Sequence, residues 1–130
     1  MNILQNLKQI NSDFIFLGDD IKNSIIENGI FTRLIYSDHY MILNCMYILI
    51  DPTEFSHKVL IETLIELEQT ILSKIEINKK TQYKIKDYLK HLNLSSMFED
   101  KLKKCILKIS GIWQTDIEYG ITFKFLELDS

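Results

Sequence analysis

The chain has 130 residues, of which 46% are hydrophobic, with a formal net charge of −3, four glycines and one proline. This profile indicates one compact domain over residues 1–130 and excludes a disordered chain. The mild acidity argues against a general nucleic-acid binder. The amino terminus lacks the pattern of a signal peptide, and the most apolar run, 41–50, is too short to span a bilayer. We therefore expect a cytoplasmic protein with no membrane contact.

Short elements are expected in the first thirty residues. Apolar residues at helical spacing predict a helix over 3–10. The apolar run 14–17 predicts a brief strand or a docking segment. A helix capped by Asp19 or Asp20 is expected to follow and to end at Asn28-Gly29, which is a typical C-terminal signal.

The segment 30–76 predicts an αα-hairpin. On a helical wheel, the apolar residues between Phe31 and Leu49 fall within one arc, as expected of a helix that faces the core. Asp51-Pro52-Thr53-Glu54 then reads as a helix start, because Asp51 can cap and proline suits the first turn. The second helix is expected over about 53–76, antiparallel to the first because the joint is short.

Asp38 complicates the first of these two helices. An unpaired carboxylate in the apolar arc is costly, so Ser37-Asp38 is a candidate for a fresh helix start. The segment 31–36 is then a separate piece. A β-hairpin that turns at Ser37-Asp38-His39 is the rival interpretation, since β-branched and aromatic residues are plentiful here.

The C-terminal half predicts two helices and a strand. One helix begins at Thr81, and another runs from Ser95 or Ser96 to Gly111. Residues 117–126 alternate between apolar and polar, which is the rhythm of a strand. Its expected partner is 14–17, the region 30–50 or a second copy of the chain. The predicted fold class is therefore mainly α, a bundle of about six helices around the 30–76 hairpin with a small C-terminal β element; the alternative is α+β.

No motif in the chain names a reaction. The three histidines form no pair at metal-ligand spacing, and there is no glycine-rich phosphate loop or nucleophile elbow. Cys45 and Cys105 lie among apolar residues, as packed free thiols do. We therefore expect no catalytic residue, no metal and no cofactor.

The segment Arg33-Leu34-Ile35-Tyr36-Ser37-Asp38-His39 has an arginine six residues before a histidine. This resembles the Arg…His pair of HEPN-type ribonucleases. The resemblance covers these seven residues, and Leu34 stands where that family usually has a polar residue. It implies a helical-bundle dimer in which the pair assists attack of a ribose hydroxyl on phosphate.

Residues 78–110 hold nine basic and three acidic side chains. The lysines of this segment are candidates for phosphate contacts, with Tyr83 and Tyr88 available to stack on bases. Asp87 and two further acids interrupt the cluster, so a solvated helix face is the preferred explanation. The lysines concerned are Lys84, Lys86, Lys90, Lys101, Lys103, Lys104 and Lys108.

A second surface combines tyrosine and arginine with acidic residues, a composition typical of protein interfaces. It predicts a small protein-binding inhibitor, such as an immunity protein or antitoxin that neutralises a toxin, for example a cationic nuclease. Lysine outnumbers arginine fourteen to one and alanine is absent, as in AT-rich bacterial or phage genomes. The alternatives are a nucleic-acid-binding or HEPN-like ribonuclease module, a phage anti-defence protein, or a homodimer. The predicted partner-binding residues are Arg33, Tyr36, Tyr40, Tyr47, Glu54, Glu62 and Glu66.

Overall fold

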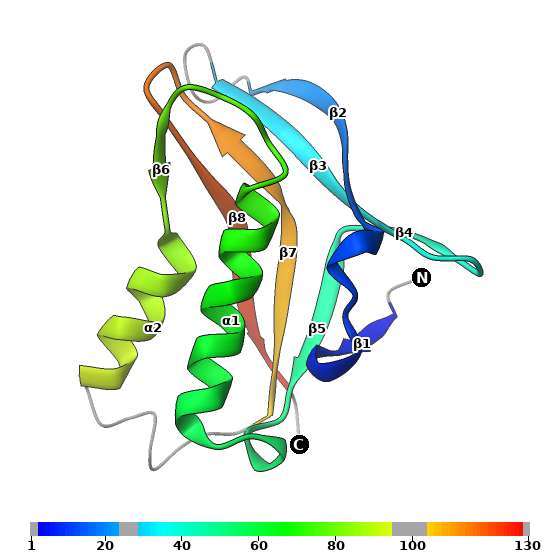
Figure 1. Cartoon of the computed structure of the whole chain (residues 1–130), viewed down its shortest axis with the longest axis vertical. Helices are drawn as coiled ribbons and strands as arrows, with labels where there is room; N and C mark the ends of the chain where they lie inside the picture. The colour runs from blue at the N-terminus through cyan, green and yellow to red at the C-terminus, as the bar shows by residue number, and fades with distance from the viewer. Residues whose placement is uncertain (1–2, 24–28, 95–103, 129–130) are drawn as a thin grey trace.

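The computed structural model describes residues 3–23, 29–94 and 104–128. They form one curved eight-stranded sheet with two α-helices and three short 3-10 turns (Figure 1). The strands are β1 (Leu4–Asn6), β2 (Ile15–Asn23), β3 (Gly29–Ser37), β4 (Ile42–Asn44), β5 (Met46–Ile50), β6 (Lys80–Gln82), β7 (Cys105–Gln114) and β8 (Glu118–Glu127). The helices are α1 (His57–Leu72) and α2 (Lys84–Leu94), and the turns are η1 (Leu7–Gln9), η2 (Ser12–Phe14) and η3 (Pro52–Glu54).

Strand β7 is the centre of the sheet. One of its edges pairs with β8 along almost the whole strand. Its other edge is divided, so that 105–109 pairs with β5 and 111–114 pairs with β3. Strand β2 flanks β3, β1 flanks β5, and β6 lies beyond β8. The pairs β1–β5 and β6–β8 are parallel and the others are antiparallel.

The divided edge of β7 depends on a kink at Cys45. This residue has φ 64 and separates β4, which pairs with β3, from β5, which pairs with β7. Its N–H donates to the Leu34 carbonyl oxygen at 2.8 Å, so the backbone stays bonded at the kink. Register shifts in β2 and β7 mark β-bulges, which bend and twist a strand. These irregularities give the sheet its curvature.

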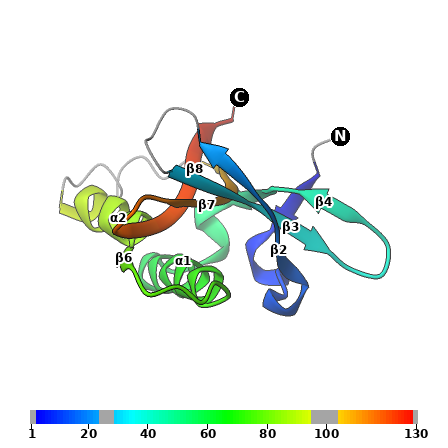
Figure 2. The same cartoon turned by 90° about the horizontal axis from the view of Figure 1, so that it is seen from above.

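Both helices lie on the same side of the sheet (Figure 2). Helix α1 buries Leu60, Leu64, Leu67 and Ile71, a stripe at helical spacing that belongs to the same core as the buried residues of β5 and β7. The sequence starts this helix at Ser56, whose hydroxyl accepts from the Val59 N–H. No helix of the described part of the chain is both long and apolar enough to cross a membrane.

Glu68 joins the two helices. Its side chain is fully buried on α1, and its carboxylate accepts from the backbone N–H groups of Ile85 and Lys86 at 2.7 and 2.9 Å. The first N–H groups of a helix lack partners within the helix, so this carboxylate caps α2 from a neighbouring element. Burial raises the pKa of Glu68, although the two N–H donors oppose that shift.

The prediction of a six-helix bundle is wrong, and the chain is mainly a β-sheet protein with two α-helices among the described residues. The predicted helix over 30–50 is instead β3, β4 and β5, and the rival β-hairpin interpretation is correct for this segment. Both faces of these strands carry apolar residues, so the alternation of period two is hidden and a helical wheel finds an arc by chance.

The predictions of three other helices are also wrong where the structure describes their residues. Residues 3–10 contain β1 and η1. The strand alternative for 14–17 is correct, but β2 continues to Asn23 and includes Asp19 and Asp20, which were expected to cap a helix. The predicted helix that ends at Gly111 is β7 over 105–111, and its earlier part, 95–103, lies outside the described residues. Residues 24–28 of the predicted helix before Gly29 also lie outside them.

Some local predictions are confirmed in part. Asp51 accepts from the Thr53 N–H and hydroxyl, which lower the pKa of the Asp51 carboxyl, but it caps the separate turn η3 and not the predicted helix. That helix covers 57–72 within the predicted 53–76, and Ser56 caps it. Helix α2 and the C-terminal strand are also present, but α2 begins at Lys84, and its predicted cap, Thr81, lies in β6. The partners of that strand are β7 and β6, and none of the three expected candidates.

Candidate functional site

The two sides of the sheet are covered differently. Both described helices pack on one side, and none of the described helices covers the other, here called the open face (Figure 2). Residues directly opposite one another on neighbouring strands share a face, so the pairing register shows which side chains meet there. Three successive rows of the open face run from β3 or β5 across β7 to β8. They are Phe31–Trp113–Gly120, Arg33–Gly111–Thr122 and Tyr47–Lys108–Lys124.

Two aromatic rings of the open face are seated on glycines. A Cβ at Gly111 would lie 2.8 Å from Cζ of Phe31, and one at Gly120 would lie 2.9 Å from Cζ2 of Trp113. Each ring therefore occupies the space that a side chain would fill on the neighbouring strand. Both rings are half-buried, so they retain contact with solvent. A Cβ would also meet a backbone oxygen, that of Thr32 at Gly111 and that of Gln82 at Gly120, so the close approach of backbone requires glycine here as much as the rings do.

Three basic side chains share the face with these rings. Lys108 on β7 lies directly opposite Lys124 on β8, and Arg33 is exposed one row away on β3. The Lys108 ammonium lies 5.4 Å from the centroid of the Tyr47 ring, a cation–π contact. Within the described ranges, none of these three cations forms an ion pair with an acid. We name Phe31, Arg33, Tyr47, Lys108, Trp113 and Lys124 the aromatic-basic band.

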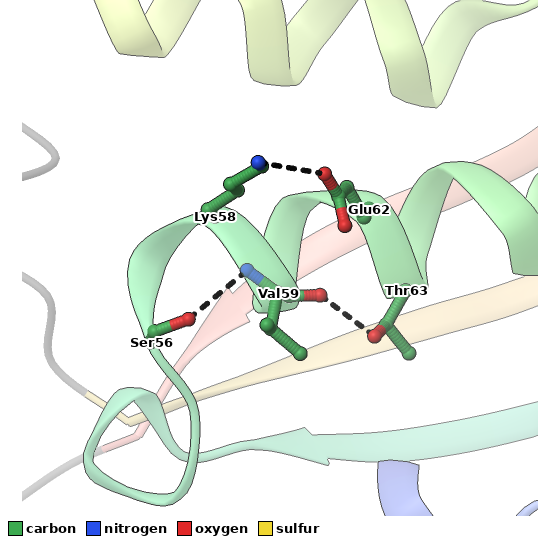
Figure 3. A network of polar contacts seen from close by, with 5 residues as sticks. All are labelled: Ser56, Lys58, Val59, Glu62 and Thr63. Atoms are coloured by element: carbon green, nitrogen blue, oxygen red, sulfur yellow. Dashed lines mark hydrogen bonds and ion pairs between the residues drawn. The ribbon is translucent and has the colours of Figure 1, made fainter.

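Acidic residues predicted to bind a partner lie elsewhere. Glu62 and Glu66 are exposed on α1, on the opposite side of the sheet from the band, and Glu54 is exposed in η3. Glu62 lies 4.0 Å from Lys58 one turn earlier, a solvent-exposed pair close to the helix start (Figure 3). Such a pair contributes little to stability. The fold therefore separates these acids from the cations of the open face, although the net charge is −3.

The arginine and tyrosines of the predicted partner surface do not share one helix face. Arg33 and Tyr47 lie together on the open face. Tyr36 is buried on the helix-covered side, where its hydroxyl accepts from the Asn11 N–H at 3.1 Å. Tyr40 is 91% exposed in the loop between β3 and β4. The seven residues thus belong to separate surfaces, and whether any of them contacts a partner stays a prediction.

The HEPN resemblance does not extend to the structure. The Arg…His pair of that family comes from helices, whereas Arg33 lies on a strand and His39 in the following loop. The His39 ring packs edge-on against Phe14, with centroids 6.0 Å apart. Arg33, by contrast, points to the open face. A ribonuclease of that family is therefore not supported.

The lysine cluster is also divided by the fold. Lys84, Lys86 and Lys90 are exposed on α2, and Lys104 lies 3.7 Å from the Asp51 carboxylate. Lys108 alone belongs to the band, while Lys101 and Lys103 lie outside the described residues. Helix-face solvation remains the simplest explanation for the lysines of α2.

Half of the band is not among the residues predicted to bind. The helical pattern places Phe31 in the core, and without the pairing of β7 nothing singles out Trp113 or Lys124. The segment 105–114 does contain a signal for a strand, since it is rich in isoleucine and carries an aromatic residue. Pairing it with 118–127 would have placed Lys108 opposite Lys124. Only the pairing register of β7 with β8 shows that these two lysines lie opposite each other.

The side chains of the band are suited to binding a ligand. Among the described residues, no group of three or more His, Cys, Asp or Glu side chains is arranged to hold a metal ion. Burial raises the pKa of the Cys105 thiol, which keeps it protonated and a poor nucleophile. Cations and aromatic rings together suit an anionic ligand that also has flat apolar surfaces.

The chain matches no protein-family model, no curated protein and no solved structure with which it was compared.

Proposed function

We propose that this protein binds single-stranded nucleic acid through the aromatic-basic band. The observation that carries the proposal is the combination, on the open face of the sheet, of Arg33, Lys108 and Lys124 with half-buried aromatic rings. Proteins that bind single strands use cations to follow the phosphates and aromatic rings to stack on the bases. A duplex hides its base faces, so the band favours an unpaired strand.

The overall acidity of the chain is compatible with this proposal because affinity depends on the local field. The exposed acids Glu62 and Glu66 lie on α1, behind the sheet as seen from the band. Charges separated by more than about 10 Å are largely screened at physiological salt. The cytoplasmic location expected from the sequence is part of the proposal, since single-stranded RNA is available there.

Fluorescence anisotropy with labelled single-stranded RNA and DNA tests the proposal. The variant Arg33→Gln/Lys108→Gln/Lys124→Gln should weaken binding at least tenfold at low salt, because each lost phosphate contact removes counterion release. The matched control, Lys84→Gln/Lys86→Gln/Lys90→Gln, removes the same number of charges from α2 and should retain the affinity. Equal losses of affinity in both variants would show that the effect comes from net charge alone. The band would then be rejected as the binding site.

A second candidate function is contact with a protein, and the hairpin β3–β4 favours it. The hairpin projects from the body of the molecule and carries Tyr40, Met41 and Ile42 with large exposed fractions, 91% and 72% for the first and the last (Figure 1). Asp38 orders the loop by accepting from the N–H groups of Tyr40 and Met41. An ordered, exposed apolar tip is typical of an interaction surface.

The sequence predicts an inhibitor whose partner contacts a helix face within 30–50, but this segment forms strands. A protein partner would therefore contact this tip instead. A second copy of the chain is the first partner to test. Sedimentation velocity should show self-association that Tyr40→Ser/Ile42→Ser abolishes. A monomer at all concentrations would remove the second copy as the partner.

A further inference from the structure

We infer that the bound strand has a fixed orientation on the band, with bases on the Phe31–Trp113 row and phosphates on the Lys108–Lys124 row. This inference rests on the proposed function and assigns roles within the same site. The two rows are separated by the row of Arg33 and Gly111. Successive residues on one face of a strand are about 7 Å apart. The base row and the phosphate row are therefore about 14 Å apart, so a bound segment of more than one nucleotide is needed to reach from one to the other across Arg33.

The base row is defined by the seating of the rings. Phe31 and Trp113 are directly opposite each other on β3 and β7. Each lies against a glycine of the next strand, with 2.8 and 2.9 Å between ring atoms and the position a Cβ would take. This fixes the rings before a ligand arrives, so little side-chain freedom is lost on binding. No charged residue belongs to the described part of this row, which suits the faces of bases.

The phosphate row is defined by two cations that repel each other. Like charges directly opposite on neighbouring strands destabilise a sheet, and Lys108 and Lys124 are such a pair. The Tyr47 ring beneath Lys108 holds that ammonium at 5.4 Å from its centroid. An anion placed between the two ammonium groups would relieve their repulsion. Both lysines lie on the open face, where Lys124 is exposed.

Arg33 lies between the two rows. Its side chain is exposed, and its neighbours in the row are Thr122 and Gly111, against which the Phe31 ring lies. A guanidinium at this place can donate to a phosphate or stack on a base, because its planar group serves both purposes. The ligand that fits is thus a short unpaired segment, read by its base faces and its charge and not by a particular sequence.

The first test uses the wild-type protein and two strands of equal length and charge, one with bases and one entirely abasic. Trp113 is the only tryptophan, so its fluorescence reports the base row without a label. The base-bearing strand should bind about tenfold or more tightly and quench Trp113, since stacking strengthens binding about five- to 150-fold per base. Equal affinity for the abasic strand would overturn the orientation while leaving the proposed function intact. No binding of either strand at low salt would overturn both.

Two double variants then separate the rows. Phe31→Leu/Trp113→Leu keeps an apolar cover on the glycines and should abolish the preference for bases without changing the salt dependence. Lys108→Gln/Lys124→Gln should keep the preference and reduce the slope of log affinity against log salt by about 1.4, from about 0.7 per phosphate contact. Circular dichroism confirms that each variant folds. The opposite result would be a reduced salt slope for Phe31→Leu/Trp113→Leu and a lost preference for bases for Lys108→Gln/Lys124→Gln. It would assign the rows the other way round and reject the inference.

Discussion

The two faces of one strand, β7, differ in burial and in chemistry. On the helix-covered side, Leu107, Ile109 and Ile112 are fully buried. On the open face, Ile106, Lys108 and Trp113 are half-buried and include a charge and an indole. The first set packs against other aliphatic residues and stabilises the fold. The second set includes features, such as the opposed lysines, that stability alone does not require.

This difference indicates where substitutions should affect stability and where they should affect binding. Buried aliphatic side chains contribute through close packing, which any truncation disturbs. Cations on a solvent-facing sheet contribute little to stability and can even reduce it. Substitutions of charged residues on the open face should therefore change binding with little effect on stability. Substitutions on the covered face should mainly lower stability.

The largest effect is expected from Leu107→Ala. Leu107 is fully buried, so its truncation should lower the free energy of unfolding by about 2–5 kcal/mol through lost transfer energy and a residual cavity. The matched variant Ile106→Ala, at the adjacent position but on the open face, should cost about 1 kcal/mol because that side chain is only half-buried. Urea unfolding measures both. Equal losses would mean that the two faces do not differ in packing.

A somewhat smaller effect is expected from Gly111→Ala. The added Cβ would collide with the Thr32 carbonyl oxygen and with the Phe31 ring, so backbone must move, at a cost of about 1–3 kcal/mol. Gly18→Ala is the control, since the nearest atom to its Cβ is the end of the Ile35 side chain at 3.1 Å and its backbone contact, Arg33 O, is at 3.5 Å. Thermal unfolding should show a clear loss for the first variant and little change for the second. Similar melting of both would show that neither the Thr32 oxygen nor the Phe31 ring crowds Gly111.

Glu68→Gln tests the buried carboxylate on the covered side. Replacing it weakens the cap on α2 and should cost about 1 kcal/mol. The folded-state pKa of Glu68 is raised, so the folded chain binds this proton more tightly than the unfolded chain. The Glu68-dependent stability is fully present below the unfolded pKa and is lost as pH rises through the folded pKa.

The wild type should consequently gain stability relative to Glu68→Gln as pH falls from neutral towards the ordinary glutamate range near 4.5. Denaturant unfolding of both proteins at a series of pH values measures this difference. A difference that shrinks as pH falls would show that the carboxylate is preferentially stabilised in its ionised form and would contradict the stated direction.

The smallest effect on stability is expected from Lys124→Gln, and its sign is the informative part. Removing one of two opposed lysines should raise the free energy of unfolding by a few tenths of a kcal/mol and weaken oligonucleotide binding. Lys90→Gln on α2 should change neither appreciably. Loss of stability in Lys124→Gln would indicate that the lysine has a structural role.

The features that local physics controls were predictable. Asp51 with Pro52 specifies a capped turn whatever surrounds it, because the hydrogen bonds close within a few residues. Helix α2 and strand β8 follow from periodicity along the chain. In 30–50, the apolar residues lie on both faces of the strands, so periodicity misled. For β7 the spacing of its isoleucines matched a helix equally well.

The sequence by itself determined the alternating C-terminal strand, helices within 53–76 and after Thr81, and the capping role of Asp51. Tertiary structure decided that β7 joins β5, β3 and β8, since those pairings connect residues as distant as Ile30 and Gln114. The same pairing decided which side chains face solvent, because a strand sends successive residues to opposite sides. The band of Phe31, Arg33, Tyr47, Lys108, Trp113 and Lys124 exists only through this register, which no local pattern encodes.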